Sequence, residues 1–259
     1  MTDRTHTIAN KSGLAVLAAL TLICGLAWVY LLSMDWGMRH MDEGATMFIM
    51  PHMVSWEPVD LVLMFVMWAI MMVAMMLPSA TPMILLFAAL SRQRRQARTV
   101  LDVAAFVAAY VAIWTAFSLL ATLFQWGLLE ATLVSPMMDA SSPMLGGGLL
   151  IAAGVYQFTP QKDACLSKCR SPLIFLTVHW RPGARGACIV GAQHGLYCLG
   201  CCWLLMLLLF VLGVMNLFWV ALLAAFVLLE KILPEAAWFK RLAGMAFIVW
   251  GCALLLQLW

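Results

Sequence analysis

A histidine and three cysteines lie close together in the apolar segment HGLYCLGCCWLLM, residues 194–206. At about 100° per residue on a helix, His194, Cys198 and Cys201 fall within an arc of about 60°, and Cys202 lies beside it. Such a face presents one imidazole and up to three thiols, which bind soft or borderline metal ions and also carry out redox chemistry. Cysteine is also a small apolar residue in membranes, so simple packing is the alternative interpretation.

Methionines are concentrated in a second apolar segment, MFVMWAIMMVAMMLPSATPM, residues 64–83. On a helix Met72 and Met76 share one face, with Met75 beside them, near the middle of the segment. If this helix touches the cysteine helix at that depth, thioethers and thiols would form one site. Thioether and thiolate ligands together favour copper(I), and zinc is the alternative because it accepts Cys and His but seldom Met.

Two loops carry further candidate ligands. Cys165 and Cys169 are four residues apart in YQFTPQKDACLSKCR, so a short helix between Pro160 and Pro172 would point both thiols the same way. Nearby basic residues are expected to lower the pKa of these thiols. The segment between residues 35 and 58 holds His52 among methionines and acidic residues, which would bind copper(I) on the other side of the membrane, or else form an amphipathic cap.

The composition requires a membrane protein. Of the 259 residues, 65% are hydrophobic and 10% are charged, and the mean hydropathy is +0.97. A water-soluble domain of this length could not cover its surface with so few charges. We therefore expect the lipid bilayer as the surroundings of the chain and no nucleic acid partner.

Hydropathy predicts an all-α, polytopic membrane helix bundle, and we assign residues 1–259 to a single transmembrane domain. A bilayer core takes about 20 apolar residues per helix. That rule gives about seven spans, at residues 13–34, 59–88, 102–126, 144–159, 188–213, 217–233 and 242–259. Pro78 and Pro82 predict a kink or a broken end in the second span. The turn at 214–216 is short, which predicts an antiparallel hairpin of spans five and six.

The basic residues predict the orientation. With the N-terminus cytoplasmic, fourteen of the fifteen Lys and Arg residues fall on the inner side, and only Arg39 falls outside. The first span is long for a signal peptide, so we expect an uncleaved anchor. The expected location is the bacterial inner (cytoplasmic) membrane, crossed several times.

Three stretches resemble a bacterial family of predicted metal-binding integral membrane proteins. They are MWAIMMVAMMLPSATPM (67–83), GVYQFTPQKDACLSKCRSP (154–172) and GAQHGLYCLGCCWLLMLLLFVLGVMNLFWVALLAAFVLLEK (191–231), so the resemblance covers roughly residues 60–231. One departure is Gln161, where a Leu is expected. The resemblance implies metal binding in a membrane and names no substrate.

Copper(I) transport, or delivery to a membrane copper enzyme, is the function that these features favour, with a copper enzyme or a copper chaperone as the partner. A quinone-linked thiol oxidoreductase is a second interpretation, although such enzymes usually place their reactive pairs toward the oxidising side. An accessory subunit of a larger membrane complex is the third. The sequence contains no pattern that points firmly to an enzyme.

Overall fold

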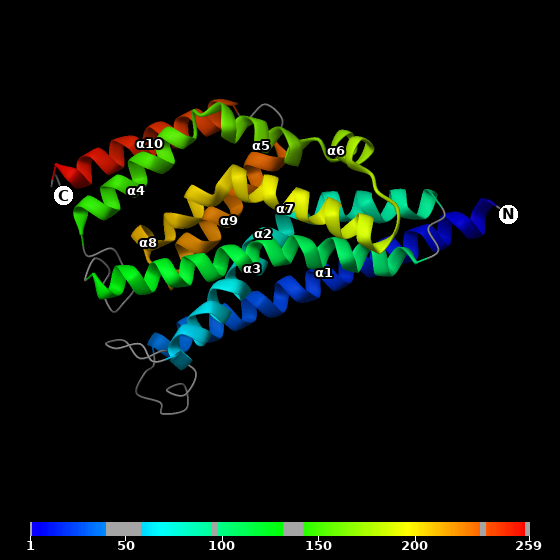
Figure 1. The fold of residues 1–259 in the computed structure, drawn as a ribbon, viewed down its shortest axis with the longest axis horizontal. Helices are drawn as coiled ribbons and strands as arrows, with labels where there is room; N and C mark the ends of the chain where they lie inside the picture. The colour runs from blue at the N-terminus through cyan, green and yellow to red at the C-terminus, as the bar shows by residue number, and fades with distance from the viewer. Residues whose placement is uncertain (1, 40–57, 95–97, 132–141, 234–236, 257–259) are drawn as a thin grey trace.

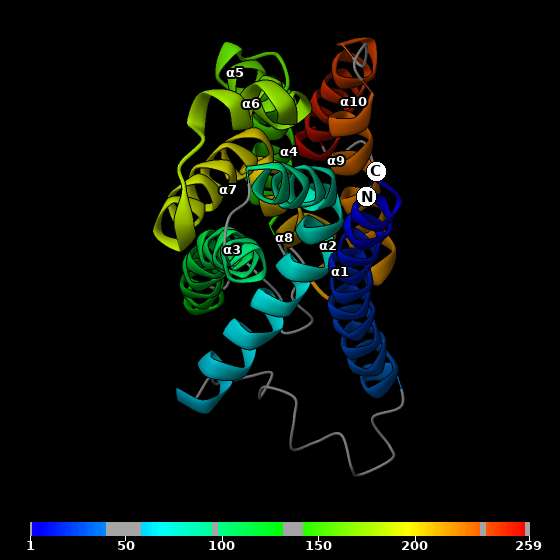
Figure 2. The ribbon, with the colours of Figure 1, turned by 90° about the vertical axis from the view of Figure 1, so that its right-hand side faces the viewer.

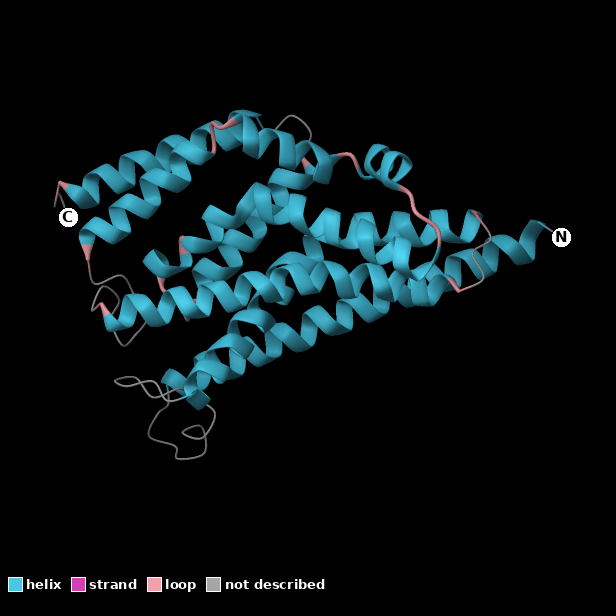
Figure 3. Ribbon diagram, viewed as in Figure 1, coloured by secondary structure: helices cyan, strands magenta, loops and turns pink. Residues whose placement is uncertain are grey.

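Every regular element in the described part of the chain is a helix, as Figure 3 shows. The computed structural model describes residues 2–39, 58–94, 98–131, 142–233 and 237–256. The helices, coloured along the chain in Figure 1, are α1 (Thr2–Arg39), α2 (Pro58–Gln93), α3 (Thr99–Glu130), α4 (Pro143–Tyr156), α5 (Pro160–Arg170), α6 (Pro172–His179), α7 (Gly183–Leu207), α8 (Leu209–Leu212), α9 (Leu217–Ile232) and α10 (Ala237–Leu255). The all-α prediction is therefore confirmed.

All seven predicted spans correspond to helices, but only five of these helices are long and apolar enough to cross a bilayer. The two short ones are α4, with 14 residues, and α9, with 16 residues. At about 1.5 Å per residue they reach about 21 and 24 Å, less than the roughly 30 Å of a hydrocarbon core.

The methionine helix α2 runs without a break through Pro78 and Pro82. Figure 2 shows that α2 changes direction along its length, as the two prolines predict. Proline has no N–H to donate to the preceding turn, so it bends a helix whose other residues still favour it. The predicted kink is present, and the alternative of a broken end is not.

Helix α7, which carries the histidine and three cysteines, packs most extensively along α3. A Cβ atom on Gly191 would lie 2.2 Å from the Phe106 carbonyl oxygen, and one on Gly195 would lie 3.0 Å from Ile113. Close approach of α3 therefore requires glycine at these positions. Small residues let another helix approach α7 here, and the structure identifies that helix as α3.

Helix α5 is a short helix between the two expected prolines. The Thr159 side chain accepts a hydrogen bond from the Lys162 backbone N–H, and Pro160 occupies the first turn. Helix α5 then packs against α7. The hairpin prediction also holds, since Gly213 adopts a positive φ of 89° between α8 and α9 and Figure 1 shows α7 and α9 running in opposite directions.

Three lysines that the sequence places among inner-side charges are buried. Their exposed fractions are 0% for Lys162, 8% for Lys231 and 7% for Lys240. Each of them is bonded to another side chain: Lys162 to Glu230, Lys231 to Cys198 and Ser79, and Lys240 to Asp163. The helices α1, α2, α3, α4, α7, α9 and α10 alternate in direction in Figure 1, and the alternation depends on the two short helices α4 and α9. The cytoplasmic position of the N-terminus stays a prediction.

Candidate metal centre

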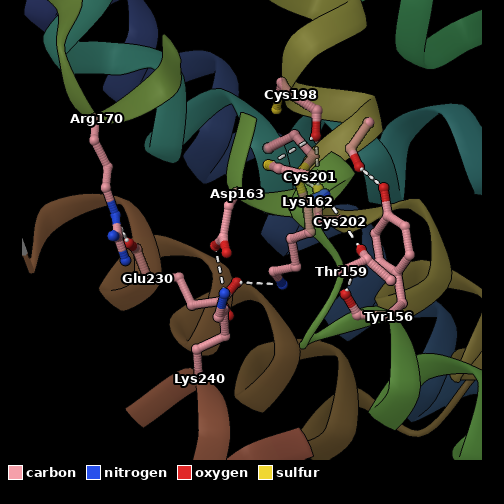
Figure 4. A network of polar contacts seen from close by, with 12 residues as sticks. Tyr156, Thr159, Lys162, Asp163, Arg170, Cys198, Cys201, Cys202, Glu230 and Lys240 are labelled. Atoms are coloured by element: carbon pink, nitrogen blue, oxygen red, sulfur yellow. Dashed lines mark hydrogen bonds and ion pairs between the residues drawn. The ribbon is translucent and has the colours of Figure 1, made fainter. Parts of the chain in front are cut away.

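The four candidate ligands of α7 all point into the protein. The exposed fraction is 2% for His194, 0% for Cys198, 1% for Cys201 and 0% for Cys202. Most of the apolar surface of a single membrane helix would face lipid, so this burial places the polar face of α7 among other helices. Figure 4 shows the three cysteines close together on one part of α7.

Two of the thiols are bonded to the backbone of the third cysteine. The Sγ atoms of Cys201 and Cys202 each donate to the Cys198 carbonyl oxygen, at 3.0 Å in both cases. These contacts satisfy the thiols within their own helix, as serine and threonine do in helices. To bind a metal ion, the Cys201 and Cys202 thiols would have to give up their hydrogen bonds to the Cys198 carbonyl oxygen.

The Cys198 thiol instead faces neighbouring helices. Its Sγ atom lies 3.0 Å from Lys231 Nζ on α9 and 3.1 Å from the Tyr110 hydroxyl on α3. Lys231 Nζ also donates to Ser79 Oγ, at 2.7 Å, and Ser79 Oγ donates to the Met76 carbonyl oxygen, at 2.8 Å. Cys198 therefore lies where α2, α3, α7 and α9 meet.

Sequence reasoning missed three members of this group: Ser79, Tyr110 and Lys231. By sequence, Lys231 at the end of an apolar segment counts as a basic residue that flanks the membrane. The available signal was its position inside the predicted span 217–233, where an ionisable residue usually has a function. Tyr110 and Ser79 gave no comparable signal, because single hydroxyl residues are common in membrane helices.

The methionines of α2 are turned into the protein and not toward lipid. Met72 and Met76 are 0% exposed and Met75 is 1% exposed. The Sδ atom of Met76 lies 4.0 Å from the Sγ atom of Cys202, so the expected meeting of thioether and thiol occurs, although at Cys202 and not at Cys198 or Cys201. Between Met72 or Met75 and the cysteines, no comparable hydrogen bond occurs in the ranges that the structure describes.

The cysteines of α5 join those of α7. The Cys169 thiol lies close enough to the Cys201 thiol for each to affect the ionisation of the other. The Cys165 Sγ atom lies only 2.7 Å from where a Cβ atom on Gly200 would be. The sequence places this pair in a loop outside the predicted spans. In the structure α5 instead packs against α7 beside Gly200 and Cys201.

The pKa values of the α5 thiols shift in the direction opposite to the expected one. The neighbouring Cys201 thiol and burial raise the pKa of Cys169 well above its ordinary value, and burial raises the pKa of Cys165. Two of the nearby basic groups are engaged elsewhere. Lys162 pairs with Glu230 Oε2 at 2.9 Å, and Arg170 Nε donates to the Glu230 carbonyl oxygen at 2.7 Å.

A polar network holds α5 in place, as Figure 4 shows. Besides the two contacts with Glu230 of α9, Lys240 of α10 pairs with Asp163. The Tyr156 hydroxyl, just before α5, donates to the Gly200 carbonyl oxygen of α7. Buried charges are tolerated when they are paired and hydrogen-bonded. The contacts of Lys162, Arg170 and Asp163 fix α5 to α9 and α10, and the Tyr156 bond joins the end of α4 to α7.

His194 lies one turn before Cys198 and has no hydrogen-bond partner on either ring nitrogen. Its ring packs against aromatic rings, with centroids 5.5 Å from Tyr110, 6.1 Å from Phe106 and 5.7 Å from Phe175. A buried polar group without a partner costs free energy. The imidazole is therefore available to a further ligand. The last candidate, His52, lies outside the described residues.

These donors fit a soft metal ion by type. Four thiols, one thioether and an unpaired imidazole lie near one another at the contact of α2, α5 and α7. As they stand, however, no three His, Cys, Asp or Glu side chains in the described part of the chain are arranged to hold an ion. Binding would therefore need side-chain rotation, beginning with the thiols bonded to the Cys198 carbonyl oxygen.

Comparison with known proteins gives one match. The sequence model of the PpoB2 family, described as a copper chaperone, matches residues 65–254. That range includes α2 from its first turns, α5, α7 and nearly all of α10. Neither the curated proteins nor the solved structures contain a match.

Proposed function

The chain belongs to the PpoB2 copper chaperone family, and from that premise we propose that it binds copper(I) inside the membrane and delivers it to a copper enzyme. The binding residues would be Cys169, Cys198, Cys201 and Cys202, together with Met76. His194 would complete the site when the thiols rotate. Thiolates and thioethers are soft ligands, and they bind copper(I) in preference to harder metal ions.

One observation carries this proposal. Sulfur atoms from three separate helices lie in one buried place, where Cys202 of α7 is 4.0 Å from Met76 of α2 and Cys201 interacts with Cys169 of α5. Packing alone does not require soft donors from different helices to converge. All eight cysteines are free thiols, which suits a metal carrier.

Delivery needs a route by which the ion leaves the buried site. Cys165 and Cys169 are the partly exposed members of the group, whereas Cys198, Cys201 and Cys202 are fully buried. A copper ion would pass from α7 to α5 by exchange of one thiolate for another. The same exchange with a partner's ligand at Cys165 would then transfer it, and ligand exchange between soft donors needs no free ion.

The test is the metal content of the purified, reduced protein after loading with copper(I) and desalting. The variant with Cys198→Ser and Cys201→Ser is expected to retain little copper. A matched control carries Cys188→Ser and Cys252→Ser, which replaces two exposed cysteines, and it is expected to retain as much copper as the wild type. Equal copper in all three proteins would overturn the proposal.

A further inference from the structure

Lys231 places an ammonium group inside the protein, beside the proposed ligands. Its side chain is 8% exposed, and its Nζ atom donates to Cys198 Sγ at 3.0 Å and to Ser79 Oγ at 2.7 Å. A buried charge is unfavourable unless another charge balances it. The question is therefore which group supplies the negative charge.

No carboxylate does so in the described part of the chain. Glu230 precedes Lys231 directly, but its carboxylate pairs with Lys162 at 2.9 Å. Asp163, the other acidic residue of the polar network, pairs with Lys240. The groups that face Lys231 are a thiol and hydroxyls, namely Cys198, Ser79 and, through Cys198, Tyr110. Of these groups, thiolate sulfur is the one suited to carry negative charge in a copper site.

We infer that Lys231 is the fixed counter-charge of the metal site and makes it prefer a monovalent over a divalent ion. This inference rests on the proposed function. Two thiolates and one copper(I) ion carry a net charge of minus one, which the ammonium group neutralises. Two thiolates and one zinc(II) ion are already neutral, so the same ammonium would leave a net positive charge.

Net charge inside a membrane raises the free energy, and here the zinc(II) site is the one that would carry net charge. Zinc could avoid it by recruiting a third thiolate, but that would also require a further thiol to lose its proton. The ligand types alone already favour copper(I). Lys231 adds selection by charge, which does not depend on whether the ion is soft or hard.

The bond to Ser79 fixes the position of the ammonium. Ser79 Oγ accepts from Lys231 and donates to the Met76 carbonyl oxygen. The lysine is therefore attached to the same turn of α2 that brings Met76 to Cys202. The Met76 thioether and the Ser79 hydroxyl that holds the ammonium thus belong to one turn of α2, while the ammonium itself comes from α9 and lies beside Cys198.

The experiment compares Lys231→Met and Lys231→Gln with the wild type. Glutamine keeps an N–H donor and removes the charge, so the pair separates charge from hydrogen bonding. The matched control is Lys168→Met, which removes one charge from an exposed position on α5. Copper(I) and zinc(II) affinities are measured by competition with chromophoric chelators, and X-ray absorption counts the sulfur atoms bound to copper.

Both Lys231 variants are expected to lower the ratio of copper(I) to zinc(II) affinity by on the order of 1000-fold, the effect of one unit charge about 4 Å away at an effective dielectric of about 20. Fewer sulfur atoms should bind copper in the variants. The Lys168→Met control should match the wild type in both measurements.

Three results would overturn the inference. An unchanged ratio in both Lys231 variants would remove the charge role while the proposed function stands. A wild-type ratio in Lys231→Gln alone would mean that hydrogen bonding, and not charge, is what matters. A wild-type protein that binds no copper(I) would overturn the proposed function and this inference together.

Discussion

The Sγ atom of Cys202 on α7 lies 4.0 Å from the Sδ atom of Met76 on α2, although 126 residues separate them in the chain. The two helices meet here through side chains, because α7 packs its backbone along α3 and α2 packs along α1 and α3. A thioether and a thiol at this separation need only small rotations to bind one ion.

Replacing Met76 with leucine is therefore expected to weaken copper(I) binding and to leave zinc binding nearly unchanged. Leucine fills a similar volume, so the fold should be retained. We expect roughly tenfold weaker copper(I) binding, the lower end of effects when the surroundings of a metal are altered. Chelator competition measures it. Met64→Leu, a buried change near the start of α2, is the control, and equal losses in both variants would contradict the prediction.

Copper(I) loading is expected to release protons at neutral pH. The pKa of Cys169 is raised by the neighbouring Cys201 thiol and by burial, so the metal-free thiol is protonated at neutral pH and must lose its proton to bind. A pH indicator in weakly buffered solution measures the release. Cys169→Ser should release fewer protons per bound copper, and an identical yield would show that Cys169 is not a ligand.

Replacing Gly200 with alanine is expected to displace α5. The new Cβ atom would lie 2.7 Å from Cys165 Sγ, and overpacking of this kind costs about 1–3 kcal/mol. Thermal unfolding in detergent and the alkylation rate of Cys165 report the change, and faster alkylation is expected. Gly148→Ala is the control, since its Cβ atom meets nothing within 4 Å. Similar behaviour of the two variants would contradict the assigned position of Cys165.

Replacing Lys162 with methionine is expected to destabilise the protein by about 3–5 kcal/mol, because it leaves the Glu230 carboxylate buried without its partner. Both side chains are almost completely buried, at 0% and 1% exposure. Asp163→Asn alters the other ion pair, in which the aspartate is 58% exposed, and should cost less than about 1 kcal/mol. Chemical denaturation in micelles compares them, and a reversed order would refute the assignment.

A reporter fused after Trp259 should be active on the outer side of the membrane. Seven helices that alternate in direction put the two ends of the chain on opposite sides, and the basic residues favour a cytoplasmic N-terminus. Three of the fourteen residues behind that inference are buried, but the others still follow it. A cytoplasmic reporter signal would mean that α4 or α9 does not cross the membrane.

The helices were predictable because apolar runs of this length have one stable arrangement in lipid. The shared face of His194, Cys198 and Cys201 was also predictable, since helical periodicity places residues around an axis. The contact of α5 with α7 was not, because it depends on how a short polar helix packs against another helix, which no sequence periodicity specifies. Lys231 was assigned to the wrong environment for a related reason, since a charge at the end of an apolar run is assumed to reach water, and only the tertiary structure shows otherwise.

The last turn of α9 connects two parts of the site that otherwise belong to different helices. Glu230 holds Lys162 and Arg170 of α5, and the next residue, Lys231, holds Cys198 of α7. A helix turn is stiff, so α5 cannot move away from α9 without altering the surroundings of the ammonium beside Cys198. Under the proposed function, loss of copper from α7 and displacement of α5 would therefore be linked mechanically and would occur in one step.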